Sequence, residues 1–175
     1  MRLEGKNVAI RPMLLKERQK FFQWATRSDA TQFWYGEISG DDVPTYVVFR
    51  TEWPDYYFSD EMPERGQCFV IEHDGEGIGE INHNEITLSD QTTYIDVLIA
   101  ERRNQEKGLG TEAIRLFYEF LFEHRGVRKV KIEVPLKNQR AIRSFCKAGF
   151  SHTYTFHRGA IHWQVMSVTL GSSLG

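Results

Sequence analysis

The chain has 175 residues, of which 41% are hydrophobic and 26% charged, and its formal net charge is −2. These values suit one soluble globular domain with a sizeable core. They exclude a membrane-spanning protein, because no apolar run approaches the roughly 20 residues that such a helix needs. They also exclude a disulfide framework, because Cys68 and Cys146 are the only cysteines. The chain does not begin with the long apolar stretch of a secretory signal, so we expect a single domain over residues 1–175 in a reducing cytoplasm.

The first half of the chain is expected to be rich in strands. Alternating apolar residues predict a strand that ends at Pro12, and apolar residues at helical spacing predict a helix over residues 16–28. Three strands are then predicted over residues 68–72, 78–83 and 93–100 from their content of β-formers and the turn signals between them.

An acidic and aromatic segment separates the first helix from these strands. Residues 29–64 contain nine acids and one base, Arg50, which gives a net charge of −8, together with nine aromatic residues. The acids are Asp29, Glu37, Asp41, Asp42, Glu52, Asp55, Asp60, Glu61 and Glu64. Residues 101–150 have the opposite bias, with twelve Lys and Arg against six Glu, a net charge of +6. Such a chain could bind a cation with one half and an anion with the other, although two solvated faces would give the same counts.

The second half of the chain alternates helices and strands. The predicted order is helix, strand, helix, strand, strand, over residues 111–124, 129–134, 139–147, 150–157 and 161–170. Pro135 is expected to end the first of these strands, and Asn138 to cap the second helix. Strands followed by strand–helix–strand–helix–strand–strand predict an α+β fold with a mixed α/β sheet, not a Rossmann repeat.

A glycine-rich turn, Gln105 to Gly110, precedes the 111–124 helix. Glycine lets the backbone come close to a ligand, and the N-terminus of the following helix presents unpaired N–H groups and a positive dipole. This combination makes an anion site suited to a pyrophosphate, and Lys107 adds a cation. A tight strand-to-helix turn without any ligand would show the same pattern.

Two blocks carry a family resemblance. Residues 105–110 resemble motif A of the GCN5-related N-acetyltransferase (GNAT) superfamily, Gln/Arg-x-x-Gly-x-Gly/Ala, and residues 138–150 are similar to its block Asn-x-x-Ala-x-x-x-Tyr-x-x-x-Gly-Phe. The resemblance covers about the last hundred residues and, more loosely, the N-terminal strand and helix. It implies a central, twisted, mostly antiparallel sheet that splays at a V-shaped cleft and is flanked by helices. It also implies acetyl-CoA as the co-substrate.

The resemblance assigns residues 93–150 to an acetyl-CoA-binding core. It implies that pantetheine amides pair with backbone at the end of the 93–100 strand and that the pyrophosphate binds the amides of the glycine-rich turn. Asn138 would contact the pantetheine arm, a role that can coexist with a plain N-cap. The cofactor residues expected on this basis are Leu98, Ile99, Ala100, Gln105, Glu106, Lys107, Gly108, Leu109, Gly110, Thr111, Asn138 and Lys147.

Phe145 departs from the superfamily pattern, which often has a tyrosine there to protonate the leaving thiolate. Phenylalanine cannot donate a proton, so water, Ser144 or Tyr154, or no protein acid at all, would serve. Thiols have a pKa near ~8.5, so the thiolate is a tolerable leaving group without an acid. Cys146 is interpreted as a small helix residue, because no histidine stands at a motif position to pair with it.

Several segments resemble the aminoglycoside 6′-N-acetyltransferases more narrowly. Residues 24–28 and 33–37 are similar to the Trp-x-x-Arg-Ser and Trp-Trp-Gly-Gly stretches of that family, and residues 95–98 to its Ile-Asp-x-Leu. The likeness implies an antibiotic-resistance enzyme. In it the acid at Asp96 would bind the substrate amine and act as the base, and Glu133 would line the antibiotic site.

The chemistry of an aminoglycoside supports this interpretation. It is a polycation built of sugar rings, so carboxylates would bind its ammonium groups and aromatic side chains such as Trp34 and Tyr35 would cover its rings. Residues 29–66 are therefore expected on the substrate side, although their aromatic residues could equally form a satellite core. Transfer would be direct, with Asp96 deprotonating the amine and a backbone N–H near Leu98 or Ile99 polarising the thioester. Asp96 could otherwise be an ordinary surface residue of its strand.

Other functions remain open from the sequence. Ribosomal-protein and spermidine acetyltransferases share the Arg11-Pro12 start, and Phe145 would also suit a non-catalytic acyl-CoA sensor. We expect no nucleic-acid partner, because the basic half is already assigned to coenzyme A and no RNA motif is present. No metal site is expected, because His73 and His83 have no cysteine partners at zinc-finger spacing. A small polycationic amine is the expected substrate, and the protein could be a monomer or a homodimer.

Overall fold

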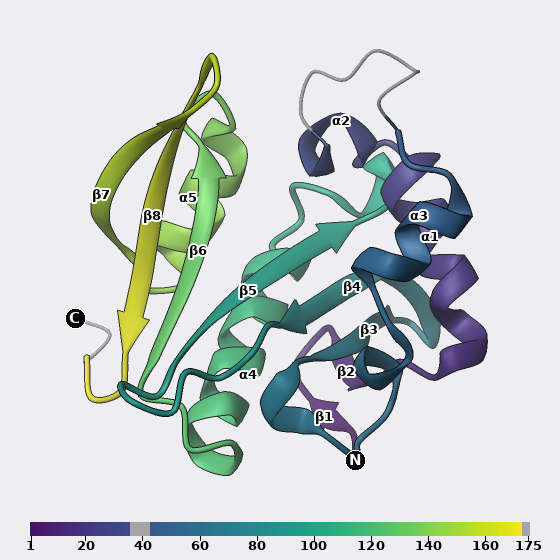
Figure 1. Ribbon diagram of the computed structural model, residues 1–175, viewed down its shortest axis with the longest axis horizontal. Coiled ribbons are helices and arrows are strands. Elements are labelled where there is room, and N and C mark those ends of the chain that lie inside the picture. The colour runs from purple at the N-terminus through teal and green to yellow at the C-terminus, as the bar shows by residue number, and fades with distance from the viewer. Residues whose placement is uncertain (36–42, 173–175) are drawn as a thin grey trace.

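The protein is described here by a computed structural model of residues 1–35 and 43–172. In this part of the chain, eight strands form one sheet in the order β1-β2-β3-β4-β5-β6-β8-β7, as Figure 1 shows. The strands are β1 (Leu3–Glu4), β2 (Ala9–Pro12), β3 (Gln67–His73), β4 (Glu76–His83), β5 (Thr92–Ile99), β6 (Lys129–Pro135), β7 (Ser151–Arg158) and β8 (Ile161–Thr169). Neighbouring strands run antiparallel except β5 and β6, which are parallel. The α+β class with a mostly antiparallel sheet is thus confirmed.

Helices cover both faces of the sheet. They are α1 (Arg18–Thr26), α2 (Thr31–Trp34), α3 (Tyr46–Glu52), α4 (Leu109–His124) and α5 (Gln139–Lys147). Residues of α4 and α5 share the larger hydrophobic core with one face of the sheet, and residues of α1 and α3 share a second core with the other face. No helix of the described residues is both long and apolar enough to cross a bilayer.

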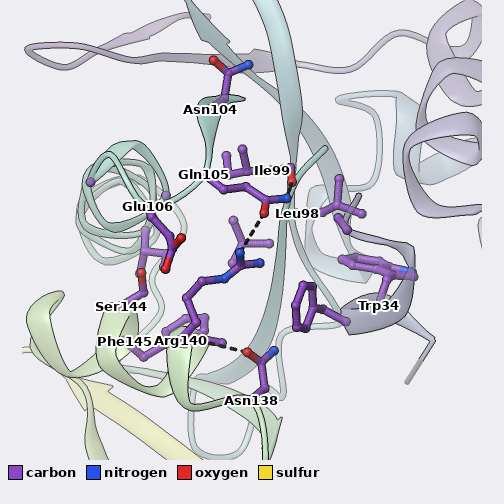
Figure 2. Close-up of a pocket in the computed structure, with 17 residues that line it drawn as sticks. Trp34, Leu98, Ile99, Asn104, Gln105, Glu106, Asn138, Arg140, Ser144 and Phe145 are labelled. Carbon is purple, nitrogen blue, oxygen red and sulfur yellow. Dashed lines mark hydrogen bonds between the residues drawn. The ribbon is translucent and has the colours of Figure 1, made fainter. Parts of the chain in front are cut away.

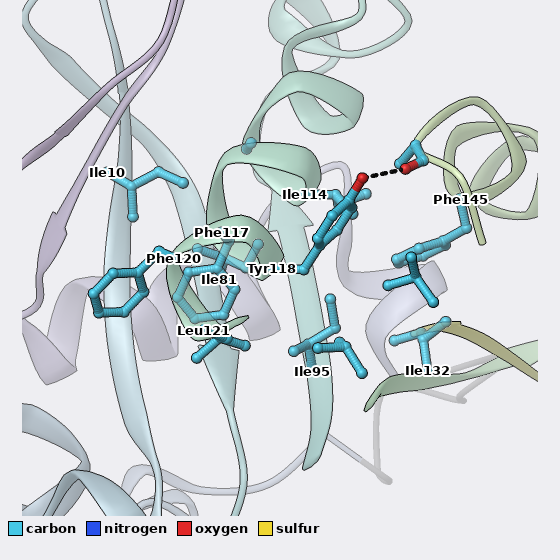
Figure 3. Close-up of a cluster of buried hydrophobic side chains, with 14 of the residues drawn as sticks. Ile10, Ile81, Ile95, Ile114, Phe117, Tyr118, Phe120, Leu121, Ile132 and Phe145 are labelled. Atoms are coloured by element: carbon cyan, nitrogen blue, oxygen red, sulfur yellow. Dashed lines mark hydrogen bonds between the residues drawn. The ribbon is translucent and has the colours of Figure 1, made fainter. Parts of the chain in front are cut away.

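The larger core forms around the apolar stripe of α4 (Figure 3). Ala113, Phe117 and Leu121 are fully buried, and Phe117 meets Phe69 of β3 edge to face at 5.0 Å between ring centroids. Burial of each large apolar side chain contributes roughly 1.5–3 kcal/mol. Tyr118 donates a hydrogen bond of 3.0 Å to the carbonyl of Ala148, which ties α4 to the end of α5. The hydrogen bond therefore fixes α4, which follows the glycine-rich turn, against α5, which follows Asn138.

The sheet opens between β5 and β6. The two strands pair only at their beginnings, where residues 92–94 lie beside residues 129–131. Beyond that point β5 continues along β4 while β6 continues along β8. Figure 1 shows the two strands diverging toward the end of the molecule where α2 and the start of α5 lie. This divergence is the splay that the family resemblance implied.

Most differences from the predicted elements lie at their ends. The sequence analysis missed β1, which has only two residues. It placed the start of the first helix at residue 16, but a 3₁₀ turn precedes α1. Pro12 ends its strand as predicted, whereas Pro135 is the last residue of β6 and does not lie beyond it, since a strand end need not donate an N–H to the ladder.

The acidic and aromatic segment contains short helices and loops, as expected. Besides α2 and α3 it forms two 3₁₀ turns, over Asp55–Phe58 and Pro63–Arg65. Three acids of this segment, Glu37, Asp41 and Asp42, lie outside the described residues.

Candidate active site

The glycine-rich turn forms the N-terminus of α4. Gly108 is the N-cap residue with φ 81°, a left-handed conformation that glycine adopts without strain. The first intrahelical bond runs from the Glu112 N–H to the Gly108 carbonyl, so the N–H groups of Leu109, Gly110 and Thr111 have no acceptor within the helix. These three N–H groups and the helix dipole can hold an anion.

Gly110 has no internal reason to be glycine. A Cβ atom added there would meet only the Ile99 side chain, at an ordinary 3.6 Å. Gly110 instead lines a narrow cavity of about 170 Å³ between the end of β5, the glycine-rich turn and α5. A close approach of a bound molecule therefore accounts for the missing side chain better than packing within the protein does.

Polar side chains cross this narrow cavity, as Figure 2 shows. Gln105 donates a hydrogen bond of 2.8 Å to the carbonyl of Ile99, and Arg140 of α5 donates one of 2.7 Å to Gln105. The Arg140 guanidinium also lies 4.4 Å from the ring centroid of Phe33. The Ile99 carbonyl therefore faces the cavity and accepts a hydrogen bond there, as it would from a pantetheine amide.

The register of β5 corrects part of the sequence expectation. The Ala100 N–H donates to the Ile78 carbonyl, and the Tyr94 carbonyl accepts from the Asn84 N–H. Because hydrogen bonding alternates along an antiparallel pair, the backbone of Leu98 also faces β4. Of the residues 98–100 expected to pair with the cofactor, Ile99 is therefore the one whose backbone faces the cleft, while the N–H groups of Leu98 and Ala100 are directed at β4. Val97 and Ile99 are the residues whose backbone groups face the cleft.

A basic cavity of about 540 Å³ adjoins the narrow one beyond α4 and α5. Its cationic side chains are Lys6, Arg115, Arg140, Arg143 and Lys147. Lys147, an expected cofactor residue, therefore lies among bases of a kind suited to phosphate groups.

The remaining residues of the turn differ in what they can contribute. Glu106, with φ 58°, lines both the narrow and the basic cavity. Thr111 lines the basic cavity, whereas Lys107 lines neither. The Leu109 side chain is buried in the larger core, so only its N–H remains for a ligand.

An acidic cavity of about 450 Å³ opens on the other side of the splay. It brings together all four residues that the sequence analysis expected on the substrate side: Trp34, Tyr35, Asp96 and Glu133. It also includes Glu52, Trp53 and Tyr57 of the segment expected on the substrate side, and Trp163, which the sequence analysis did not single out. Acids and aromatic walls therefore share one cavity, although they come from five separate stretches of the chain.

The aromatic residues of this wall also form a satellite core. The Trp34 ring lies 5.7 Å from Phe21 and 6.4 Å from Trp53, and Trp53 meets Tyr57 at 5.2 Å between centroids. The satellite core is thus present, and it does not prevent the same rings from lining the cavity. The rings pack against α1 on one side and line the cavity on the other.

Asp96 lies on β5 opposite Asn82 of β4, at the junction of the sheet and the acidic cavity. Burial, together with the charge of Glu133, raises the pKa of Asp96 to about 6. A carboxylate with this pKa is ionised at neutral pH and is a stronger base than an exposed aspartate. Burial also raises the pKa of the neighbouring Glu80 carboxyl well above its ordinary value.

Glu133 has a partner that the sequence analysis missed. Arg158, the last residue of β7, donates to it at 2.8 Å and lies over the rings of Phe156 and Trp163 at 5.3 and 5.1 Å. Arg158 falls between the strands predicted over residues 150–157 and 161–170, and the sequence analysis assigned it no role. Strand pairing brings it to the cavity, and no local sequence signal reports that pairing.

Phe145 and Asn138 line both the narrow and the acidic cavity. The Asn138 side-chain oxygen accepts from the Ala141 N–H at 3.2 Å, which confirms the N-cap and leaves the amide nitrogen for a ligand. Of the two hydroxyl groups considered as acids, Ser144 lines the narrow cavity and shares a hydrogen bond of 3.1 Å with Thr111. Tyr154 lines neither cavity.

Tyr57 is a further hydroxyl at the acidic cavity. It donates to the Asn84 side chain at 3.1 Å, and burial raises its pKa. Nothing in the local sequence distinguishes it from the other aromatic residues around it.

Known proteins resemble this chain along most of its length. The family model for the acetyltransferase (GNAT) domain matches residues 7–151. An aminoglycoside N(6′)-acetyltransferase type 1 of Klebsiella pneumoniae is 26% identical over 166 residues, which cover 85% of this chain and 76% of the relative. A spermidine N(1)-acetyltransferase of Escherichia coli K12 is 26% identical over 145 residues, which cover 83% and 73%.

Solved structures agree with these relatives. A crystal structure of an aminoglycoside acetyltransferase in complex with coenzyme A and kanamycin matches with a TM-score of 0.74 and 25% identity, covering 94% of this chain and 96% of the other. The spermidine N-acetyltransferase of Vibrio cholerae in complex with CoA and spermine matches with a TM-score of 0.73 at 16% identity, covering 96% and 98%. The second likeness concerns the fold alone.

Proposed function

Because this chain belongs to the GNAT acetyltransferase family, we propose that it transfers the acetyl group of acetyl-CoA to a primary amine of a polycationic substrate, in the manner of an aminoglycoside 6′-N-acetyltransferase. The chain is an N-acetyltransferase, and acetyl-CoA is its co-substrate. The identity of the amine is the part that we propose.

One observation carries the proposal. The acidic cavity, with three carboxylates and walls of tryptophan and tyrosine, opens beside the narrow cavity, and Val97, Asn138 and Phe145 line both. An acetyl group delivered through the narrow cavity would therefore reach an amine bound in the acidic one. Carboxylates bind ammonium groups, and aromatic rings cover the apolar faces of sugars.

We propose that the cofactor follows the surfaces already described. Its pantetheine arm would pair with the backbone of Val97 and Ile99, which requires Gln105 to release the Ile99 carbonyl. Its pyrophosphate would bind the free N–H groups at the start of α4, and its remaining phosphate the bases of the basic cavity, Lys147 among them. Residues 93–150 would then form the cofactor core, and residues 29–66 the substrate side, of one domain.

In the proposed reaction, Asp96 binds the substrate ammonium and accepts its proton, directly or through water. The free amine attacks the thioester carbon, and the N–H of Val97 or Ile99 stabilises the developing oxyanion. The new C–N bond forms as the C–S bond breaks, the nitrogen gives up its second proton to water, and the thiolate takes a proton from water, directly or through Ser144. Phe145 contributes only its apolar ring at the junction of the cavities.

A polyamine of the spermidine type is the second candidate, because the acidic cavity would also bind it and a spermidine acetyltransferase is among the relatives. The aromatic walls favour a ring-containing amine over a linear one. We further propose that the protein acts as a monomer or homodimer without nucleic acid or membrane. The free cysteines, one buried and one exposed, suit a cytoplasmic location.

The test is the release of free thiol from acetyl-CoA in the presence of aminoglycosides, polyamines and N-terminal peptides. The proposal expects the highest kcat/KM with an aminoglycoside. A clear preference for peptides would refute the proposal that the substrate is a polycation. Tight binding of acetyl-CoA without thiol release on any amine would instead identify an acyl-CoA sensor.

A further inference from the structure

The charged lining of the acidic cavity contains one cation among its acids. In the described part of the chain these charged residues are Glu52, Asp96, Glu133 and Arg158. Arg158 is paired with Glu133 at 2.8 Å, so one of the three carboxylates is already neutralised before any substrate binds. Asp96, by contrast, forms no ion pair within the described residues.

The β7–β8 hairpin sets the position of Arg158. Phe156 lies opposite Trp163 across the two strands, and Arg158 lies opposite Ile161, so all of them point to the same face of the sheet. The two stacked rings form a platform beneath the guanidinium. Figure 1 shows the turn between β7 and β8 at the same end of the molecule as α2. Arg158 and Trp34, the last residues of β7 and α2, both line the acidic cavity.

The guanidinium therefore occupies the position that a substrate ammonium would take on Glu133. We propose that Arg158 is a specificity-determining residue. It occupies the Glu133 carboxylate in place of a substrate cation. A polycation must displace it before a second substrate ammonium group can pair with Glu133. This inference rests on the proposed function, because it concerns how the same cavity selects its amine.

The contacts of Arg158 suit a displaceable group. Its side chain is 59% exposed, against 31% for Glu133, and exposed ion pairs are weak. The aromatic platform stays beneath the guanidinium when Glu133 is taken by another cation, so displacement leaves no buried charge unpaired. A monoamine needs only Asp96, whereas a polyamine reaches Glu133 by competing with Arg158. Arg158 thus limits the affinity for polycations.

The test compares Arg158→Gln with Arg2→Gln, a control that also removes an exposed arginine paired with glutamate, here Glu4 and Glu72, at a position outside the cavity lining. Calorimetry in the presence of coenzyme A measures the Kd of spermidine, kanamycin and hexylamine for each protein. We expect Arg158→Gln to bind spermidine and kanamycin about 3- to 10-fold more tightly, in keeping with an exposed ion pair. Hexylamine should change less than about twofold, and Arg2→Gln should alter none of the three.

A double-mutant cycle identifies the partner. In a Glu133→Gln background, Arg158→Gln should no longer tighten polycation binding, because the carboxylate that it frees is absent. A gain that persists in that background would overturn the competition with Glu133. Equal or weaker polycation binding by Arg158→Gln would overturn the inference itself.

Two further outcomes separate the alternatives. If Arg158→Gln weakens binding of lysine more than of cadaverine, which lacks the carboxylate, Arg158 anchors an anionic substrate group and the inference is wrong. The binding measurements need no turnover, so they can succeed where thiol release fails. In that case the proposed acetyl transfer fails while the role of Arg158 in cation selection stands. Absence of polycation binding to every variant would overturn both.

Discussion

Replacing Asp96 by asparagine is expected to make the protein more stable and less active at neutral pH. Burial and the charge of Glu133 raise the pKa of Asp96 from 3.8 to about 6. One pKa unit corresponds to about 1.36 kcal/mol, so the ionised carboxylate lowers the free energy of unfolding by about 3 kcal/mol. Asparagine has nearly the same shape and carries no charge, and it removes this destabilisation.

The sign of the pH dependence follows from the direction of the shift. Above pH 6 the carboxylate is ionised in both the folded and the unfolded protein, and only the folded protein keeps that charge partly out of water. Below about pH 4 it is protonated in both states, so the destabilisation disappears. The advantage of Asp96→Asn should therefore be full at pH 7–8 and shrink as the pH falls from 6 to 4. Urea unfolding of the variant and the wild type at pH 8 and at pH 4 measures this difference in stability.

Activity should change in the opposite direction. The variant loses the group that accepts the ammonium proton, and loss of a general base typically costs ~10²–10⁴-fold in rate. The wild-type rate should fall as the pH drops through about 6, and the variant should lack this step. The affinity for acetyl-CoA should be retained, because the cofactor surfaces are backbone groups and the bases of the other cavity. Thiol release from pH 5 to 9 and calorimetry with acetyl-CoA measure both.

Asp74→Asn is the matched control. Asp74 is 88% exposed and has φ 51°, a conformation that asparagine also tolerates, so the same chemical change should leave stability and activity alone. Near-wild-type turnover of Asp96→Asn would make Asp96 an ordinary strand residue. A variant that is less stable than the wild type at pH 8 would refute the reasoning about its buried charge.

Three further predictions concern the cofactor side. Gly110→Glu should weaken acetyl-CoA binding at least about tenfold by setting a like charge beside the pyrophosphate, while Gly110→Ala should fold normally; equal affinities in calorimetry would refute the site. Phe145→Tyr should preserve turnover, and raise it if protonation of the thiolate is limiting; lost transfer with intact acetyl-CoA binding would reveal a packing role. Asn138→Ala should cost about 1 kcal/mol of stability through the lost cap and also weaken acetyl-CoA binding; a lowered Tm at unchanged affinity would leave only the cap.

Local sequence signals predicted well the turn and helix ends that border the narrow cavity. The positive φ of Gly108, the free N–H groups at the start of α4 and the Asn138 cap each depend on a few adjacent residues. The apolar stripe of α4 is equally local, because its period of 3.6 residues can be read from one segment. The family blocks fall on these same segments, which is why the resemblance and the physical interpretation agree there.

The lining of the acidic cavity was predicted only in part, because it depends on pairing between distant strands. Asp96 and Glu133 were named through the resemblance, but the sequence did not report that Arg158 reaches Glu133 from β7. Nor could it distinguish which backbone groups of residues 97–100 face the cleft, since this depends on the register with β4. A one-residue change of register exchanges the backbone groups that face β4 with those that face the cleft, and it leaves the hydrophobic composition of the strand unchanged.

The contact of β4 with β5 gives that register a direct test. A Cβ atom added to Gly79 would lie 2.0 Å from the Leu98 carbonyl oxygen, so any larger residue must push β5 away from β4. That movement displaces Asp96 and the N–H of Ile99 together, because both belong to the same strand. Gly79→Ala should therefore lower the free energy of unfolding by at least about 1–3 kcal/mol and reduce kcat, whereas Gly110→Ala, whose new Cβ meets only an ordinary contact, should keep its stability. Urea unfolding and thiol release measure the two effects. If Gly79→Ala kept wild-type stability and turnover, the close approach of β4 and β5 would not be what positions Asp96 and the N–H of Ile99. The assignment of Val97 and Ile99 as the residues whose backbone faces the cleft would then be wrong.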